Sequence, residues 1–160
     1  MATYNRTSSG GGTVGHPSSA ANAYVVTSPV YDAVDNTQLG QGDIVELVDV
    51  PADTLIIGGC VEVLEAAGNS NVSMDLGFTG GDVDCFIDGS ALAAGFQPFL
   101  NAAIGASGSN PKMLTSADTI DALILDSGSS GETAGRFRIH VVMVDVSKNP
   151  VESATVTTGT

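Results

Sequence analysis

Apolar and polar side chains alternate with a period close to two over most of residues 24–148, and valine, isoleucine and threonine occupy many of the apolar positions. A period of two places successive side chains on opposite faces of a β-strand, whereas a helical face repeats about every 3.6 residues. β-branched side chains also favour strands over helices. The pattern predicts strands at residues 23–34, 43–50, 54–66, 71–78, 82–87, 118–126 and 135–146.

Turn-forming residues separate these segments. Pro29 interrupts the first one, and because proline has no amide hydrogen for a β-ladder, we expect this segment to lie at a sheet edge or to split there. Stretches rich in Gly, Pro, Asn and Ser predict turns at 50–53, 66–71 and 126–135. Short strands with regular turns predict an all-β fold, an antiparallel β-sandwich or jelly roll.

Residues 88–105 depart from the strand pattern. Ser90 is suited to cap a short helix that would run through Ala94 and end at Gly95. Pro98 would prevent a long helix. The sequence therefore predicts a long, partly helical loop around residues 88–105.

The segment 135–146 has the clearest strand pattern. We expect one face of it in the core, the face formed by Phe137, Ile139, Val141 and Met143. The other face changes from cationic to apolar along its length, through Arg136, Arg138, His140, Val142, Val144 and Val146. Its apolar part should be covered by the second sheet, by a loop or by another subunit.

The cationic part of this face has two interpretations. Arg136, Arg138 and His140 can pair with carboxylates on the neighbouring strand of the same sheet. Alternatively, they can dock acidic residues of a neighbouring copy or partner, so we treat them, with Val142 and Val144, as interface candidates. In the second case, replacing both arginines with glutamate should weaken assembly.

The two ends of the chain differ from the core in composition. Residues 1–23 consist largely of Gly, Ser, Thr, Asn and Ala, which bury little apolar surface, and we interpret them as a flexible N-terminal arm or one that orders only against a neighbouring subunit. Residues 149–160 have a similar composition and predict a flexible tail. Residues 24–148 are enough for one domain without disulfides or metals.

The chain is strongly acidic. With 5 Lys+Arg and 18 Asp+Glu, its net charge is −13 at pH 7, which repels nucleic acid and anionic membrane surfaces, so we expect neither as a partner. Self-association would have to depend on apolar and main-chain contacts. The sequence has no apolar run long enough to span a bilayer and no signal-peptide pattern. Cys60 and Cys85 could pair if their strands lie adjacent. Without an export signal, we expect cytosolic synthesis with both cysteines as reduced, buried thiols.

Residues 82–88 raise the question of a calcium site. An EF-hand counted from Asp84 would place Phe86 and Gly95 at the third and twelfth positions, where oxygen ligands are needed, so that motif is excluded. The strand pattern instead favours solvated carboxylates, with Asp82, Asp84, Phe86 and Asp88 outward and Val83, Cys85 and Ile87 inward. A looser calcium site formed by Asp82, Asp84 and Asp88 is the alternative.

The sequence contains no recognisable catalytic constellation. It has no tryptophan and only three tyrosines, whereas glycosidase clefts usually need aromatic platforms beside their two carboxylates. Its histidines are His16, in the arm, and His140, and no serine lies in a G-x-S-x-G context. Phosphate-binding Gly-Lys loops and C-x-x-C metal knuckles are also absent from the sequence. We therefore expect no enzymatic activity and no cofactor.

The order of four segments resembles a known class of protein. These segments are LGQGDIVELVDVPADTLIIGGCVEVLEA, NVSMDLGFTGGDVDCFIDGSAL, SADTIDALIL and AGRFRIHVVMVDVS, within residues 39–147. Together they resemble small structural proteins of tailed bacteriophages, in particular head decoration or cement proteins of β-sandwich or jelly-roll type. The resemblance includes neither end of the chain, and its motifs are structural rather than catalytic.

The resemblance implies a virion protein on the outer surface of the capsid. Such a protein would bind the major capsid protein, stabilise contacts between its copies and form a homotrimer, after synthesis in the host cytoplasm. The acidity of the chain suits an outer surface better than one facing packaged DNA. The alternatives are a tail or head-fibre subunit, and a calcium- or carbohydrate-binding β-sandwich module.

Overall fold

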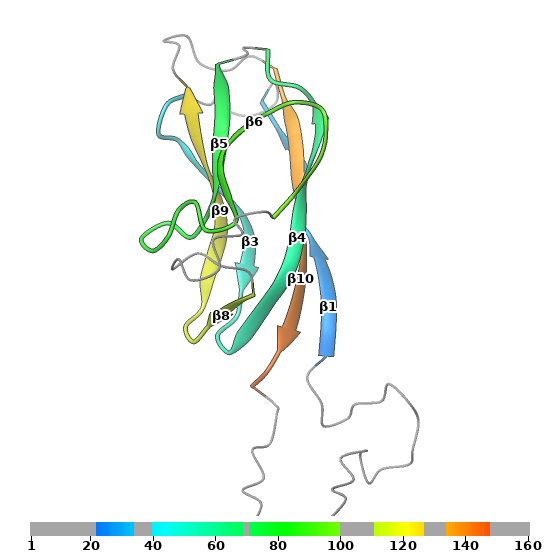
Figure 1. Ribbon diagram of the computed structural model, residues 1–160, viewed down its shortest axis with the longest axis vertical. Helices are drawn as coiled ribbons and strands as arrows, with labels where there is room; N and C mark the ends of the chain where they lie inside the picture. Colours follow the sequence, from blue (N-terminus) through cyan, green and yellow to red (C-terminus); the bar gives the residue numbers. More distant parts are fainter. Residues whose placement is uncertain (1–21, 34–39, 69–70, 100–110, 127–133, 148–160) are drawn as a thin grey trace, which may run out of the picture.

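The computed structural model describes residues 22–33, 40–68, 71–99, 111–126 and 134–147. These residues form two antiparallel sheets packed face to face (Figure 1). Sheet A contains β1 (Asn22–Thr27), β2 (Tyr31–Asp32), β4 (Thr54–Glu65), β7 (Gly95–Pro98), β8 (Lys112–Leu114) and β10 (Arg136–Asp145). Sheet B contains β3 (Ile44–Val50), β5 (Val72–Gly77), β6 (Ile87–Ala91) and β9 (Asp118–Asp126).

The strand order is that of a jelly roll. In sheet A, β1 and β2 both pair with β10, so together they act as one interrupted edge strand. In the same way, β7 and β8 both pair with β4 and form the opposite edge. The resulting order is β1/β2, β10, β4, β7/β8, and sheet B has the order β3, β9, β5, β6. Strands thus pair in nested fashion from the ends of the chain inward, β1 with β10, β3 with β9, β4 with β7 and β5 with β6. This nested antiparallel pattern folded into two sheets confirms the predicted fold class.

The core lies between the sheets and follows the period-two pattern. Phe137, Ile139, Val141 and Met143 of β10 are all buried, as predicted. From sheet B, Ile120, Ala122 and Ile124 of β9 face them and are fully buried. Alternation along each strand therefore supplies one apolar layer per sheet, which is the physical basis of a sandwich.

Several predicted strand positions are confirmed. β9 has the predicted bounds, and β3, β4, β5 and β10 each differ from the prediction by one residue at one or both ends. The split at Pro29 is also confirmed, because β1 ends at Thr27 and β2 begins at Tyr31, both beside β10 at the sheet edge. β8 was not predicted, since three residues are too few to show a period.

The predicted strand at residues 82–87 is wrong. These residues form a turn that closes on β5, with the Phe78 amide donating to the Asp82 carbonyl at 2.9 Å, and only Ile87 belongs to a strand. Phe86, predicted to face outward, is buried against the ring of Phe99 at a centroid distance of 4.8 Å. Burial of a large aromatic side chain outweighs the alternating pattern here.

The predicted partly helical loop is also wrong over residues 88–99. Ser90 lies in β6 and donates its hydroxyl to Gln97 of β7 instead of capping a helix. Gly95 has a φ of 126° and begins β7. Both segments complete sheet edges, so hydrogen bonding to inner strands replaces local helix formation. Residues 100–105 lie outside the described residues.

The described chain begins and ends at one end of the sandwich. Asn22 is paired with Asp145, so the first and last long strands meet there (Figure 1). β1 begins within the range predicted for the arm, and residues 1–21 and 148–160 lie outside the described residues. In the described part of the chain there is no helix with the length and apolar character to cross a membrane.

Candidate interaction surface

The interface candidates lie in a row along the outer face of sheet A. β10 presents Arg136, Arg138, His140, Val142 and Val144 there, opposite the side chains that it buries. Because antiparallel partners share a face, the register shows which neighbours accompany them. The outer face divides into a charged half and an apolar half.

The charged half centres on Glu62 of β4. Arg138 Nε donates to Glu62 Oε2 at 2.5 Å, and His140 Nε2 lies 3.0 Å from the same oxygen. The other ring nitrogen of His140 is hydrogen-bonded to Thr27 Oγ1 of β1 at 2.9 Å. The bond from Arg138, then that from His140, hold the pKa of Glu62 below its ordinary value of 4.5. The network joins β1, β10 and β4 side by side.

The prediction that these cations pair with cross-strand carboxylates is confirmed. Arg136 Nε also lies 3.0 Å from Asp32 Oδ2 on β2. Replacing Arg138 with glutamate would place two carboxylates together, so it would disturb the sheet as well as any docking. Docking of a partner by Arg136, Arg138 and His140 stays a prediction.

The Thr27–His140–Glu62 chain has the order of hydroxyl, imidazole and carboxylate found in hydrolytic triads. However, these three residues lie on the face of a sheet, and none of them lines the pocket described below. Arg138 already holds the carboxylate. The arrangement is better explained as a cross-strand network that ties three strands together.

The apolar half lies toward the end where β1 begins and β10 ends. One cross-strand row contains Ala23, Val144, Leu55 and Met113, and the next contains Val25, Val142 and Gly58. Ile57 is the extra residue of an irregularity between these rows. We call the six larger side chains the apolar patch: Val25, Leu55, Ile57, Met113, Val142 and Val144. Sequence reasoning identified only the two on β10, because the others come together through strand pairing.

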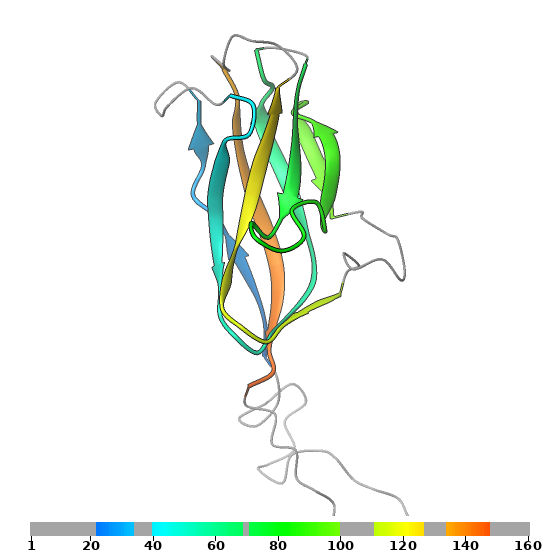
Figure 2. The ribbon, with the colours of Figure 1, turned by 90° about the vertical axis from the view of Figure 1, so that its left-hand side faces the viewer.

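The outer face of sheet B has a different character. Its four strands contain no Lys, Arg or His, and their acidic residues are Glu46, Asp49, Asp75, Asp88, Asp118, Asp121 and Asp126. Figure 2 shows this face toward the viewer, with the loop after β5 folded across it. Gly77 permits this close approach, because a β-carbon there would collide with the carbonyl oxygen of Asp82. The Lys, Arg and His side chains of the described strands therefore lie on sheet A, whereas carboxylates lie on both sheets. Asp75, Asp121 and Asp126 of sheet B are buried, and its exposed carboxylates are Glu46, Asp49, Asp88 and Asp118.

The acidic loop does not assemble a metal site in the described residues. No group of three or more His, Cys, Asp or Glu side chains is placed there to hold an ion. Asp75 accepts a hydrogen bond from the Gly89 amide at 2.7 Å, and burial raises the pKa of its carboxyl. Asp82, Asp84 and Asp88 lie in the loop and on β6, so the calcium alternative gains no support from their geometry.

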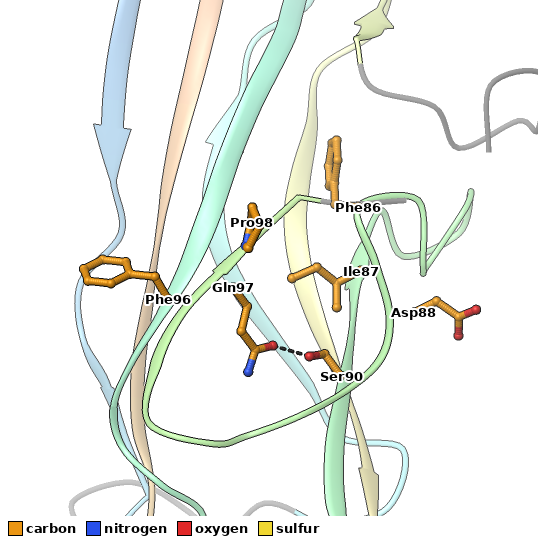
Figure 3. A pocket seen from close by; sticks show the side chains of 7 residues that line it. All are labelled: Phe86, Ile87, Asp88, Ser90, Phe96, Gln97 and Pro98. Atoms are coloured by element: carbon orange, nitrogen blue, oxygen red, sulfur yellow. Dashed lines mark hydrogen bonds between the residues drawn. The ribbon is translucent and has the colours of Figure 1, made fainter. Parts of the chain in front are cut away.

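A pocket of about 360 Å³ opens between the edge strands β6 and β7. It is lined by Phe86, Ile87, Asp88, Ser90, Phe96, Gln97 and Pro98, and the Phe96 and Asp88 side chains point to opposite sides of it (Figure 3). Gln97 accepts the hydroxyl of Ser90 and donates to the Ala91 carbonyl at 2.7 Å. Its amide therefore links the edges of the two sheets.

The two cysteines are separate free thiols. Cys85 is buried, and that burial raises the pKa of its thiol to about 12. Cys60 is half-buried on sheet A, where burial and the Glu62 carboxylate raise its pKa. Neither is activated toward nucleophilic chemistry, since reactive thiols have lowered pKa values.

Comparison with known proteins gives matches of fold rather than of sequence. No family model and no curated protein matches the chain. Among solved structures, a chain of "Cyanophage Pam1 capsid asymmetric unit" matches with a TM-score of 0.57 at 13% identity, covering 90% of this chain and 99% of that one. A chain of "Capsid of Ralstonia phage GP4" matches with a TM-score of 0.54 at 16% identity, covering 83% and 90%. A chain from the acid-stable capsid of Helicobacter pylori bacteriophage KHP30 matches with a TM-score of 0.50 at 14% identity, covering 78% and 89%. The protein thus shares its jelly-roll fold with chains from three phage capsids.

Proposed function

We propose that this protein is a capsid decoration, or cement, protein of a tailed bacteriophage, which binds the outer surface of the head and stabilises contacts between major capsid proteins. The observation that carries the proposal is the shared fold with chains from three phage capsids. All three matched chains come from capsid structures, which favours the head over the tail or fibre alternative.

The extent of the matches supports an accessory role on the shell. The match with the Pam1 chain covers nearly the whole of both chains, so the two are of similar length. The matched capsid chain is therefore about as short as this one, rather than a much longer protein. A small chain with this fold is what the sequence resemblance to cement proteins implies.

The charge distribution supports a position outside the shell. Packaged DNA is polyanionic, and a protein with a net charge of −13 would be repelled from it. The exposed carboxylates of sheet B, which are Glu46, Asp49, Asp88 and Asp118, suit contact with solvent. We further propose the major capsid protein as partner and a homotrimer as the bound form, both following from the resemblance.

The proposal can be tested on particles of the phage that encodes this chain. Purified virions should contain the protein as an abundant component by mass spectrometry. Fab fragments raised against the purified protein should decorate the heads of intact virions in electron micrographs. Absence of the protein from virions, or Fab labelling confined to tails, would overturn the proposal.

A further inference from the structure

The apolar patch on the outer face of sheet A is an exposed surface that the monomer fold leaves without a cover in the described residues. Val25 is 65% exposed, Ile57 45% and Met113 44%, in a chain with a net charge of −13. We propose that this patch is the surface through which copies of the chain bind one another. The inference assigns a surface to the self-association already proposed as a homotrimer, and it can fail without the capsid role failing.

The patch is continuous across the sheet. Val25 on β1 pairs with Val142 on β10, Val144 pairs with Leu55 on β4, and Leu55 pairs with Met113 on β8. Directly paired side chains have β-carbons about 5 Å apart, so these residues form one surface. Val25, Ile57 and Met113 are exposed and the other three members are partly buried between them. Exposed apolar side chains that adjoin one another mark interaction sites, whereas scattered ones are ordinary.

Electrostatics selects a second copy as the occupant. Two chains with a net charge of −13 repel one another, and contact through sheet B would bring carboxylates together. No side chain of the patch is ionisable. In the neighbouring half of the face, the paired Arg138 and Glu62 largely neutralise each other. Sheet A is therefore the face that two copies can share with the least repulsion.

Other occupants fit the patch less well. A basic partner would be drawn to the acidic face of sheet B instead. Residues 1–21 and 148–160 join the described chain at this end of the sandwich, but their composition of Gly, Ser and Thr offers few apolar side chains to cover the patch. A second copy brings an uncharged apolar surface that matches the patch, as homo-oligomer interfaces do.

The ion-paired residues then have a different role from that of the patch. Arg138, His140 and Glu62 satisfy one another within the chain, so they are not available as the main attachment to a neighbour. Val142 and Val144, in contrast, form one larger apolar surface together with the four other members of the patch. Burial of the apolar patch supplies the free energy of association. The charged half of the face permits close approach of the second copy, because its charges are paired within the chain.

The test is the mass of the full-length protein in solution, measured by sedimentation velocity at several concentrations. The decisive variant is Ile57→Asp, and its matched control is Ile44→Asp. Ile44 is 47% exposed, on β3 at the edge of sheet B, so the two substitutions are chemically identical and similarly exposed. Val25→Asp, on an edge strand, is a second variant in case Ile57→Asp fails to fold. Circular dichroism and thermal melting check the fold of each variant.

We expect the wild-type protein and Ile44→Asp to sediment as the same multiple of the 16.0 kDa chain. Ile57→Asp or Val25→Asp should sediment as a folded monomer or raise the dissociation constant at least tenfold. A wild-type monomer at all concentrations would overturn the inference. So would equal effects of the substitutions on the two faces. If the wild type is monomeric and Ile57→Asp alone abolishes capsid binding, the patch belongs to the shell contact, and the proposed function stands without the self-association.

Discussion

Phe86 and Phe96 lie ten positions apart and occupy opposite environments. Phe86 is 1% exposed and packs against Phe78 and Phe99, with centroid distances of 5.4 and 4.8 Å. Phe96 is 68% exposed at the edge of sheet A. The alternating pattern of residues 82–88 predicted the reverse for Phe86, because single-chain periodicity does not show that the backbone turns back after Phe78.

Substitution of the two phenylalanines tests this difference. Phe86→Ala should lower the free energy of unfolding by about 3–5 kcal/mol, because it removes a fully buried ring and leaves a cavity. Phe96→Ala should change it by no more than about 0.5 kcal/mol. Urea denaturation of both variants provides the measurement. Equal effects of the two substitutions would mean that the turn at 82–87 is placed wrongly.

Glu62 gives a pH-dependent prediction. Its pKa is lowered in the folded chain, first by the bond from Arg138, so it favours folding above its ordinary pKa of 4.5, and this contribution is lost as the pH falls through the lowered value. Wild type should therefore melt at a higher temperature than Glu62→Gln at pH 7, and the difference should shrink below about pH 4.5. Melting curves between pH 7 and 3 provide the measurement.

The control for this experiment is Glu46→Gln on β3 of sheet B, an exposed carboxylate that has no salt bridge within the described residues. Its difference from wild type should be small at pH 7. A Glu62→Gln difference that is constant from pH 7 to 3 would contradict the proposed role of the network.

At the scale of elements, the sequence predicts best where a strand buries one whole face. β9 and β10 were located closely because their alternating residues face the core along their full length. β6 and β7 were missed because they are edge strands of four or five residues whose partners lie elsewhere in the chain. The helix predicted from Ser90 to Ala94 used local capping preference alone, and strand pairing outweighs it.

The contact between β4 and β10 depends on a glycine. A β-carbon at Gly59 would lie 2.5 Å from the backbone oxygen of His140 and would also collide with the ring of Phe99. Gly59→Ala should therefore lower the free energy of unfolding by about 1–3 kcal/mol, since the strands must separate. Gly81→Ala is the matched control, because its nearest neighbour would be 3.6 Å away. Comparable melting temperatures for the two variants would contradict this packing.

In the candidate surface, too, the pattern of a single strand identifies some residues, and only strand pairing identifies the others. The change from cationic to apolar along β10 was readable from the sequence, and it identified Val142 and Val144. Val25, Leu55, Ile57 and Met113 belong to three other strands, and a period-two pattern does not show which strands become neighbours. The pairing of Arg138 with Glu62 likewise depends on register between segments 76 positions apart.

At the scale of the whole molecule, the two faces of the sandwich are chemically different. Sheet B presents carboxylates without cations on its strands, while sheet A combines paired charges with the apolar patch. An uncharged patch on one face gives such a molecule a preferred contact surface in the proposed self-association. This asymmetry connects the proposed self-association with exposure of the acidic face to solvent.

The predicted N-terminal arm is expected to contribute to capsid attachment rather than to folding. Residues 1–20 precede β1, and the described strands form both sheets by pairing with one another. Deleting these residues should leave the melting temperature within a few degrees of wild type and reduce attachment to capsids. Thermal melting and capsid cosedimentation together provide the measurement. If the truncated protein binds capsids as well as the full-length protein, the jelly roll alone is responsible for attachment.

The most direct test of the central claim is a titration of purified protein onto heads of the same phage that lack it. Cosedimentation should show saturable binding at a fixed ratio to the major capsid protein, and the loaded heads should release DNA at a higher temperature than bare heads. Binding that does not saturate, or saturation without any gain in the thermal stability of the heads, would contradict a decoration role.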